Sequence, residues 1–370
     1  MKLAPAAAAQ EERRDDRAYA AAQDFLLGTK TFWTTRMFPA LRAEYEARKS
    51  AASPPSPSPE TPQMVAAMLR DSTLYQGFAW AERHLQRMKY SGRYGLVNWH
   101  ARDRARLEAR LAGASARLDP TLEMPRYYRS VDIHQHPGGV WSDSLAGFVY
   151  ERGARTTTPL AGDAHRDLHQ RLVAEVGRLC EPRSILDMGC GFGKSTRPFG
   201  ERFPEARIEA IDLSAPCLRL AACMDADAQT GRIGYAQVDA RSTGLPGASF
   251  DLVTSTMLLH ELPPREVAAT LAEAARLLAP GGWMVHLDFL PQVQPRRDAF
   301  AQFIHYGHGR RNNEPFMEPL ARMDLAALLA DLGCTDIALL AFEEAPGALD
   351  PANPNWRFPW TLIRARKAPA

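Results

Sequence analysis

Several features that would assign this chain to a class at once are missing from its sequence. No apolar run approaches the roughly 18 residues that a membrane-spanning helix needs. The N-terminal apolar stretch is short and leads directly into charged residues 11–17, which argues against a secretory signal. The cysteines form no C-x-x-C pair, and there are five of them: Cys180, Cys190, Cys217, Cys223 and Cys334. An odd, scattered set of this kind indicates reduced thiols, so we expect a cytoplasmic protein with no membrane partner.

An excess of charge of one sign is also missing. The chain has 45 Lys and Arg residues against 43 Asp and Glu residues, which gives a net charge of only +2. Such a balanced surface provides no strong field that would hold a polyanion, so we expect no nucleic-acid partner. Hydrophobic residues make up 45% of the sequence and charged residues 24%, as is typical of globular proteins.

Residues 1–120 have a mainly helical pattern, because apolar side chains recur among charged ones over about 14–48 and 62–112. The positions marked as apolar are Tyr19, Phe25, Leu26, Phe32, Trp33 and Leu41 in the first stretch, and Met64, Met68, Leu74, Phe78 and Trp80 in the second. Between them, the prolines within residues 53–59 predict a stiff, extended linker near 51–61. The Arg-rich run 102–117 is interpreted as a solvated helix face. This helical region is a candidate to form a homodimer or to cap a pocket.

The pattern of apolar and polar residues changes near residue 163, where short apolar runs begin to alternate with longer helical stretches. That alternation predicts an α/β domain over 163–370, with a mostly parallel sheet covered by helices on both faces. The expected strands are 184–188, 208–212, 233–238, 250–255, 283–289, 336–342 and 360–364, and helices should begin near 163, 195, 215, 264 and 319. The stretch 343–359 is rich in proline and has no helical period, so the last two strands should pair antiparallel. Residues 121–162 form a connection or lid segment.

A glycine-rich loop follows the first of these strands. Asp187 ends the strand, Gly189, Gly191 and Gly193 follow, and Lys194 opens a helix. Glycines allow positive φ angles and let the backbone approach a ligand closely. A dinucleotide-binding G-x-G-x-x-G pattern would need glycine at position 194, and the spacing of a phosphate-binding P-loop is absent. These details argue against a nicotinamide oxidoreductase.

Acidic residues follow the next two strands at the same edge of the sheet. Asp212 ends the second strand, where a carboxylate can accept both hydroxyl protons of a ribose. Asp239 follows the third strand, where it can accept from an adenine amino group. Residues 250–253 form a buried fourth strand, and Pro-Gly-Gly at 280–282 turns a helix into the fifth. Open α/β sheets bind their ligands at this carboxyl edge.

Together these elements resemble the class I (Rossmann-like) S-adenosylmethionine-dependent methyltransferases, especially the branch near the quinone C-methyltransferases. The resemblance covers about 165–365 and implies a seven-stranded sheet with a reversed C-terminal hairpin, and S-adenosylmethionine as the cofactor. It also implies that Gly189 and Gly191 lie beside the methionyl part, Asp212 on the ribose, and Asp239 with Ala240 near the adenine. The full set of expected cofactor-binding residues is Asp187, Gly189, Cys190, Gly191, Gly193, Asp212, Leu213, Asp239, Ala240 and Thr254.

Residues 256–261, after the fourth strand, face the sulfonium in this fold. Methyl transfer is an in-line displacement, so the enzyme must mainly align the acceptor and exclude water, and a base is needed only if the acceptor loses a proton. His260 is the candidate base and Glu261 its orienting carboxylate. The alternative is that His260 only packs against the loop. The [DNS]-P-P-[YFW] motif of N-methyltransferases is absent, which disfavours nucleobases and amide nitrogens as acceptors.

A second polar cluster lies in the connection segment. We interpret it as a lid over the acceptor, made by Tyr127, Tyr128, His134, His136, Trp141 and Tyr150, of which His134, His136 and Tyr150 are also candidate catalytic residues. His134 and His136 are two residues apart and would share one face of a strand, where a third ligand would complete a zinc or iron site. No third ligand has a convincing spacing, so no metal is predicted. An ordinary polar loop is the alternative.

A third cluster, at residues 305–316, lies between the fifth and sixth strands and is expected to be an insertion that selects the substrate. Its amides and guanidinium groups could bind a polar or carboxylate-bearing molecule. The expected substrate-binding residues are Trp141, Tyr306, Asn312 and Asn313. The alternative is that Arg310 and Arg311 are solvated and that the two asparagines form a turn.

These observations predict a methyltransferase that acts on a small molecule. The alternative from another class is a catalytically silent protein of the same fold, which binds the cofactor and serves as a partner or regulator. The sequence does not identify the acceptor or the element that is methylated.

Overall fold

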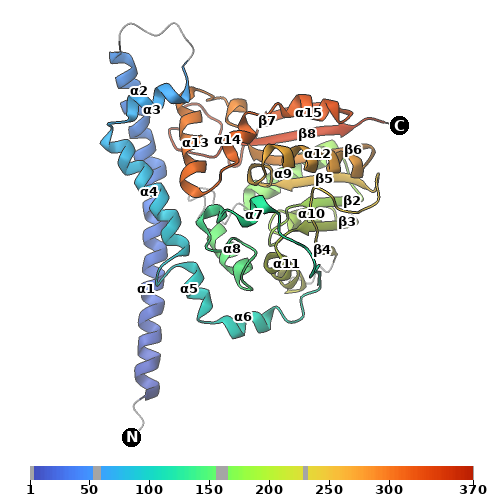
Figure 1. Cartoon of the computed structure of the whole chain (residues 1–370), viewed down its shortest axis with the longest axis horizontal. Helices are drawn as coiled ribbons and strands as arrows, with labels where there is room; N and C mark the ends of the chain where they lie inside the picture. The colour runs from blue at the N-terminus through green and yellow to red at the C-terminus, as the bar shows by residue number, and fades with distance from the viewer. Residues whose placement is uncertain (1–3, 53–59, 156–165, 228–231, 370) are drawn as a thin grey trace.

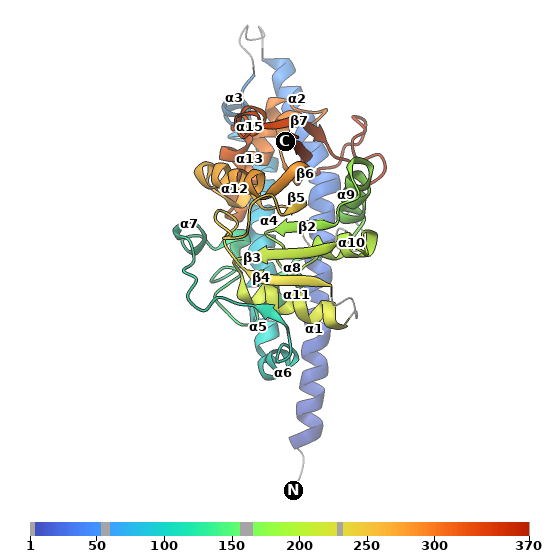
Figure 2. The same cartoon turned by 90° about the vertical axis from the view of Figure 1, so that its right-hand side faces the viewer.

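The computed structural model describes residues 4–52, 60–155, 166–227 and 232–369 of the chain (Figure 1). Its N-terminal part is helical, as predicted. It consists of α1 (Ala4–Phe32), a π-helical turn (Trp33–Met37), α2 (Phe38–Ala51), α3 (Pro62–Leu69), α4 (Thr73–Tyr90), α5 (Leu96–Ala101) and α6 (Arg104–Arg110). Figures 1 and 2 show α1 running along the long side of the molecule. Most of the predicted proline linker, residues 53–59, lies outside the described residues.

Only one side of these helices faces the interior. Leu26, Leu41 and Phe78 are buried, whereas Phe25 is 56% and Trp80 66% exposed. The apolar pattern therefore overestimated the buried face, because a helix that packs along one stripe leaves the apolar residues outside that stripe in solvent. Within the described part of the chain, no helix combines the length and the apolar character needed to cross a membrane.

The sheet has one strand more than the predicted seven. Its strands are β1 (Ala116–Arg117), β2 (Ser184–Met188), β3 (Arg207–Asp212), β4 (Ile233–Gln237), β5 (Phe250–Thr256), β6 (Leu278–Phe289), β7 (Cys334–Ala341) and β8 (Trp360–Lys367). The additional strand is β1, which pairs parallel with the edge strand β4. It lies at the end of the Arg-rich run interpreted as a helix face, and two residues are too few to produce a strand pattern in a sequence.

The strand order is β1-β4-β3-β2-β5-β6-β8-β7. The first six strands in this order pair parallel, and β8 pairs antiparallel with both β6 and β7. The predicted reversed hairpin is thus confirmed at one edge of an otherwise parallel sheet. The parallel order brings the carboxyl ends of β2, β3, β4 and β5 to one edge.

Helices cover both faces of the sheet, as Figure 2 shows. One face carries α9 (Arg166–Leu179) and α10 (Thr196–Arg202), while the other carries α12 (Pro264–Leu277) and α15 (Leu325–Asp331). Helix α11 (Ala215–Asp227) packs against β3 and β4.

The segment predicted as a substrate-selecting loop is a helix. Residues 299–312 form α13 (Ala299–Asn312), which begins at Asp298, whose side chain accepts a hydrogen bond from the Ala301 N–H, and a short helix α14 (Met317–Ala321) follows. The sequence pattern missed α13 because its buried face contains His305, Asn312 and two glycines in place of a regular apolar stripe. At Asn313 the backbone is left-handed (φ 58°), which ends the helix.

The connection segment contains α7 (Arg126–Arg129), a 3-10 turn (Ile133–Gln135) and α8 (Ala146–Ala154). His134 has a positive φ of 59°. The expectation that His134 and His136 share the face of a strand is therefore wrong, because the chain turns sharply between them. The last residues of this predicted segment lie in 156–165, outside the described residues.

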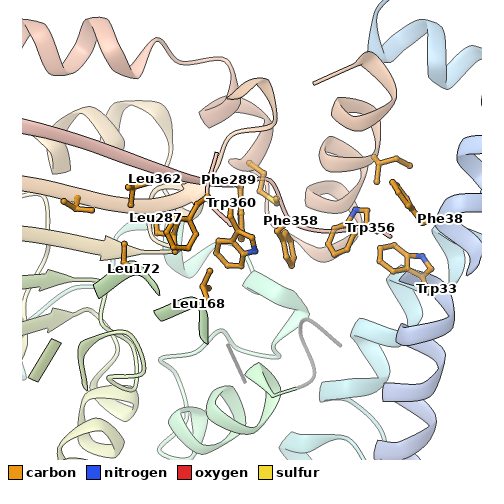
Figure 3. Packing of buried hydrophobic residues seen from close by; sticks show 14 of the residues in the cluster. Trp33, Phe38, Leu168, Leu172, Leu287, Phe289, Trp356, Phe358, Trp360 and Leu362 are labelled. Atoms are coloured by element: carbon orange, nitrogen blue, oxygen red, sulfur yellow. The ribbon is translucent and has the colours of Figure 1, made fainter. Parts of the chain in front are cut away.

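One hydrophobic core joins the N-terminal helices to the sheet. Leu26, Leu41 and Phe78 belong to the same buried cluster as Phe289 and Trp360 at the ends of β6 and β8. Figure 3 shows how the aromatic side chains bridge the two regions, with Phe358 and Trp356 between the strand ends and Trp33. We propose that 1–120, 121–162 and 163–370 are segments of one cooperative unit.

Leu41→Ala should destabilise the whole chain by about 2–5 kcal/mol, because a fully buried leucine leaves a cavity in the shared core. In urea unfolding, the midpoint seen by tryptophan fluorescence and the midpoint seen by far-UV circular dichroism should both move to the same lower urea concentration. Leu340→Ala, at a 43% exposed position of β7, is the matched control and should change stability by less than about 0.5 kcal/mol. A shift confined to one of two separate transitions would contradict the single unit.

Candidate active site

A large cavity opens at the carboxyl edge of the parallel strands and extends to the N-terminal helices. It encloses about 1920 Å³ of empty space, including the part open to solvent. Its walls come from the glycine loop, the ends of β3, β4 and β5, the connection segment, α13, and helices α1 and α4. Segments that are far apart in the sequence therefore share one cavity.

The glycine loop forms the floor of this cavity, and its conformation requires glycine. Gly189 has a φ of +71°, and a Cβ atom there would lie 2.8 Å from Leu258 Cδ1. Gly189, Cys190 and Gly191 line the cavity. Gly193 does not, but its φ is +74° and a Cβ would lie 2.7 Å from the Tyr235 hydroxyl. The loop thus presents bare backbone to whatever occupies the cavity.

Asp187 stabilises this loop on the side away from the cavity. Its carboxylate is fully buried and accepts hydrogen bonds from the hydroxyls of Ser195 (3.2 Å) and Thr196 (2.6 Å) at the start of α10. Burial raises the pKa of Asp187 to about 7. Asp187 does not line the cavity, so its predicted contact with a cofactor is replaced by a contact with the loop that would bind one.

Asp212 lines the cavity at the end of β3. One carboxylate oxygen accepts from the Gly191 N–H (2.8 Å) and the other from the Ser214 N–H (2.8 Å). Burial raises its pKa to about 6. The carboxylate is thus fixed by two backbone donors, and each oxygen keeps a second lone pair that can accept from a ligand. Leu213 lies beside it in the cavity wall.

Asp239 and Ala240 also line the cavity, next to an arginine that the sequence reasoning did not single out. The Arg241 guanidinium donates to both oxygens of Asp239 (2.6–3.0 Å) and to Glu266 (2.8 Å). Arg241 lies 5.5 Å from the centre of the Tyr127 ring. A ligand that contacts Asp239 therefore contacts a carboxylate that is already paired with Arg241.

Thr254 does not reach the cavity. Its hydroxyl donates to the Val285 carbonyl oxygen inside the sheet (2.7 Å), and the side chain is fully buried. Thr256, at the last position of β5, lines the cavity instead. The sequence located the strand correctly, but it did not show how far the strand extends toward its ligand-binding edge.

His134 is held between two carboxylates. Its Nδ1 lies 3.0 Å from Glu314 Oε1 and its Nε2 lies 3.1 Å from Glu261 Oε1. Burial alone would lower the pKa of His134, but the two hydrogen bonds and charges outweigh it and raise the pKa to about 10. The same contacts lower the pKa of Glu314 to about 2 although this carboxyl is buried. His134 is therefore a cation at neutral pH and cannot accept a proton.

His260 has a different partner from the one expected. Its Nδ1 lies 2.8 Å from Asp288 Oδ1 at the end of β6, while Glu261 is bonded to His134. His260 is 2% exposed and lines the cavity, and its Nε2 lies 3.9 Å from Glu314 Oε2. Burial opposes its charge, but Asp288 with Glu314 and Glu261 raises the pKa of His260. The hydrogen bond to Asp288 leaves Nε2 as the ring nitrogen that can face a ligand.

The connection segment contributes some of the predicted lid residues and not others. Tyr127, Tyr128 and Tyr150 line the cavity. The Tyr150 ring stacks on His134 at 5.9 Å and meets Phe192 of the glycine loop edge-on at 5.6 Å. His136 and Trp141 do not line the cavity.

His136 is buried behind the lid, with its ring 5.0 Å from Tyr90. Burial and the nearby charge of His134 lower the pKa of His136 to about 4. Among the predicted substrate-binding residues, Asn312 lines the cavity and Tyr306 and Asn313 do not. The Asn313 side chain donates to the Asp132 carbonyl oxygen (3.2 Å). Because residues 299–312 form a helix, side chains that are close in the sequence lie on different faces, and of these three only Asn312 reaches the cavity.

The N-terminal helices, which the sequence left as a candidate to cap a pocket, form one wall of the cavity, but none of the residues in this wall was predicted. Lys30, Glu82, Gln86 and Lys89 line the cavity, together with an aromatic group: Trp33, Phe289, Trp356, Phe358 and Trp360. On α4 the polar residues occupy positions 82, 86 and 89, which share a face with the buried Phe78 and Leu85. Polar residues on an apolar stripe were the signal that could have indicated a site here. No group of three or more potential ligands within the described ranges is arranged to hold a metal ion.

Comparison with known proteins agrees with the predicted resemblance. Residues 185–282 match a family model described as a methyltransferase domain. The malonyl-[acyl-carrier protein] O-methyltransferase of Paenibacillus sp. is 27% identical over 47% of this chain and 67% of the relative. The demethylmenaquinone methyltransferase of Thermus thermophilus is 34% identical over 32% of this chain and 51% of the relative. The chain thus spans about half to two thirds of the length of these curated relatives.

Among solved structures, human N-acetylserotonin methyltransferase in complex with SAM aligns over 95% of this chain and 98% of its own, with a TM-score of 0.46 and 16% identity. The family model and the curated relatives confirm the resemblance that the glycine loop and the strand-end acids carried.

Asp212→Ala should weaken the binding of S-adenosylhomocysteine by about 10- to 150-fold, because a charge-assisted hydrogen bond contributes roughly 1.5–3 kcal/mol. Calorimetric titration measures the change. Asp336→Ala, an exposed position on β7, is the control and should bind as the unchanged protein does. A folded Asp212→Ala variant with full affinity would show that Asp212 does not contact the ligand.

Proposed function

We propose that this chain, whose sheet region is a class I S-adenosylmethionine-dependent methyltransferase domain, transfers a methyl group from S-adenosylmethionine to a small molecule. One observation carries the proposal. A single cavity joins the glycine loop and Asp212 to a buried His260 that is bonded to Asp288. The first group of residues suits a nucleoside cofactor, and the second suits proton transfer from an acceptor. A catalytically silent protein would need the first group only.

The residues of the cofactor end fit S-adenosylmethionine. Gly189 and Gly191 line the cavity, and without a Cβ their backbone can be approached closely by a ligand. Asp212 offers carboxylate lone pairs to ribose hydroxyls, and Asp239 with Ala240 lies at the end of the neighbouring strand. S-adenosylmethionine supplies a methyl group on a sulfonium centre, which is reactive toward any well-aligned nucleophile. The chain must therefore position the acceptor and keep water out.

We infer that the acceptor is a hydroxyl group and that His260 is the base. Asp288 holds Nδ1, as the acid of a catalytic triad holds its imidazole, and this leaves Nε2 to take a proton. The acceptor oxygen loses its proton to Nε2 and forms a bond to the methyl carbon in line with the carbon–sulfur bond. The bonding electrons of the latter stay on the sulfur of the product, S-adenosylhomocysteine. His134, as a cation between Glu261 and Glu314, holds the lid closed and positions Tyr150.

The relatives support an oxygen acceptor. The Paenibacillus relative is named as an O-methyltransferase, and so is a relative from Saccharothrix syringae that is 32% identical over 38% of this chain. The five cysteines are free thiols, and we propose that the protein acts in a reducing compartment, the cytoplasm.

His260→Gln should lower kcat by about 10²–10⁴-fold and leave the affinity for S-adenosylhomocysteine unchanged. Since the pKa of His260 is raised, the neutral base accumulates only above the usual imidazole range, so kcat should rise with pH and level off at a higher pH than an ordinary histidine would give. Asp288→Asn removes the charge that raises this pKa and should move the inflection to lower pH. His136→Gln, outside the cavity, is the control and should keep the profile of the unchanged protein. A nearly normal His260→Gln with a flat pH profile would exclude His260 as the base.

We further propose that the N-terminal helices form a homodimer. The helices α1 and α4 contact each other and expose large apolar side chains: Phe25, Leu27 and Phe32 on α1 and Trp80 and Met88 on α4 are 40–66% exposed. Contact with a second copy would remove such side chains from water. Sedimentation equilibrium should show a dimer that dissociates in the double variant Phe32→Glu, Trp80→Glu. Leu340→Glu on β7 should remain dimeric. A monomeric unchanged protein at micromolar concentration contradicts this part of the proposal.

A further inference from the structure

A second cavity shares part of its wall with the candidate active site. It encloses about 730 Å³ of empty space, including the part open to solvent. Its walls come from α2, the residues that follow β6, helix α13 and the segment between β7 and β8. The glycine loop, Asp212 and His260 do not line it. The mechanism proposed above therefore assigns this second cavity no role.

Two aromatic rings belong to both cavities. Trp356 and Phe358 line the candidate active site and also the second cavity. The two rings meet edge-on with their centres 4.6 Å apart, and both side chains are buried. Figure 3 shows them between the strand ends and Trp33 of the N-terminal region. A molecule in the second cavity would therefore contact rings that also form a wall of the first.

His305 is a buried histidine in the wall of the second cavity. Its side chain comes from α13 and is 4% exposed. Neither ring nitrogen has a hydrogen-bond partner among the residues that the structure describes. The ring contacts of His305, with Phe289 at 6.4 Å and Tyr306 at 6.0 Å, are aromatic contacts. A buried polar group without a partner is unfavourable, so a ligand that bonds to this ring would gain free energy.

The charge state of His305 limits the kind of group that it can bind. Burial lowers the pKa of His305 to about 3, and the charges of His308 and His260 act in the same direction, while Glu314 opposes them. The ring is therefore neutral at physiological pH. A neutral imidazole has one N–H donor and one acceptor nitrogen. A hydroxyl group, which can both donate and accept, suits either nitrogen.

The charged side chains at this cavity have partners or lie in solvent. The charged residues that line it are Arg42, Arg296, Arg357 and Asp350. Arg42 pairs with Asp298 (2.5 Å), and Arg357 pairs with Glu344 (2.5 Å). The side chains at 296 and 350 are exposed. A neutral occupant therefore suits this cavity better than an ion, which would compete with these existing partners or with water.

Much of the remaining wall is apolar. Phe38 from α2 and Ile304 from α13 are buried there together with the two shared rings. Four prolines also line the cavity: Pro291, Pro295, Pro351 and Pro359. Aromatic and proline rings present rigid apolar surfaces, and aromatic side chains favour flat ligands through stacking and edge-on contacts. The wall thus favours a flat apolar body that carries few polar groups.

We propose that the second cavity binds a neutral aromatic compound with one hydroxyl group, a phenol in chemical class. Its ring lies against Trp356 and Phe358, and its hydroxyl forms a hydrogen bond with His305. This inference goes beyond the proposed function, because the site is separate from the cofactor-binding residues and from His260. It does not depend on methyl transfer.

The test is a calorimetric titration of the full chain with 2-naphthol and with 2-methylnaphthalene, in which a methyl group replaces the hydroxyl. Both should bind the unchanged protein. In His305→Leu, the affinity for 2-naphthol should fall by about 10- to 100-fold, because its hydroxyl is then buried without a partner. The affinity for 2-methylnaphthalene should stay the same or rise. Tyr306→Phe is the control, since Tyr306 is the next residue of α13 and lines neither cavity.

A second variant separates the two cavities from each other. Ala301 lines the second cavity from α13, so Ala301→Phe fills part of it and should weaken the binding of both probes by more than about 10-fold. Gln302→Phe, one position further along the helix, lines neither cavity and should bind both probes as the unchanged protein does. Far-UV circular dichroism checks that each variant is folded.

Three results would overturn the inference. The first is an unchanged protein that binds neither probe. The second is a folded His305→Leu variant that keeps its affinity for 2-naphthol or loses affinity for both probes equally. The third is a folded Ala301→Phe variant that binds both probes normally, because the probes would then occupy the first cavity. None of these results bears on the binding of S-adenosylhomocysteine, which tests the proposed function separately.

Discussion

The contact of His134 with Glu261 and Glu314 connects three of the parts of the chain that make the cavity. His134 belongs to the connection segment, Glu261 follows β5, and Glu314 follows α13. Burying three ionisable groups is costly unless they are paired and hydrogen-bonded, and here the imidazolium meets a carboxylate on each side. This arrangement forms only when the connection segment, the residues after β5 and the residues after α13 all hold their positions relative to one another. The shape of this part of the cavity follows from it.

The same arrangement separates the roles of two histidines that look alike in the sequence. His134 is surrounded by two carboxylates, so it is held as a cation and can only donate. His260 is bonded to one buried carboxylate through Nδ1, so its other nitrogen is directed to the cavity. His136, two residues from His134, is buried against Tyr90, and burial together with the charge of His134 lowers its pKa to about 4. Local environment, and not residue type, decides which ring can exchange a proton.

The N-terminal helices line the cavity and also belong to the hydrophobic core. Leu26, Leu41 and Phe78 pack into the cluster that contains the ends of β6 and β8. On the same helices, Lys30 and Lys89 line the cavity. A region that could have been an independent dimerisation module therefore helps to define what the cavity can hold.

The sequence by itself determined the elements whose signals are local. The strand 184–188 leads directly into the glycine loop, and Asp212 ends the next strand. Their residue types are dictated by backbone geometry and by the ligand edge of a parallel sheet. Helix α13 escaped sequence reasoning because His305, Asn312 and two glycines interrupt its buried apolar face, and β1 because two residues carry no period. Only the tertiary structure decided that His260 bonds to Asp288 instead of Glu261, and that lysines from α1 and α4 meet at the cavity. Such contacts join residues that are 28 to nearly 60 positions apart, and their side-chain pairing depends on how the elements pack, which no local pattern of residues records.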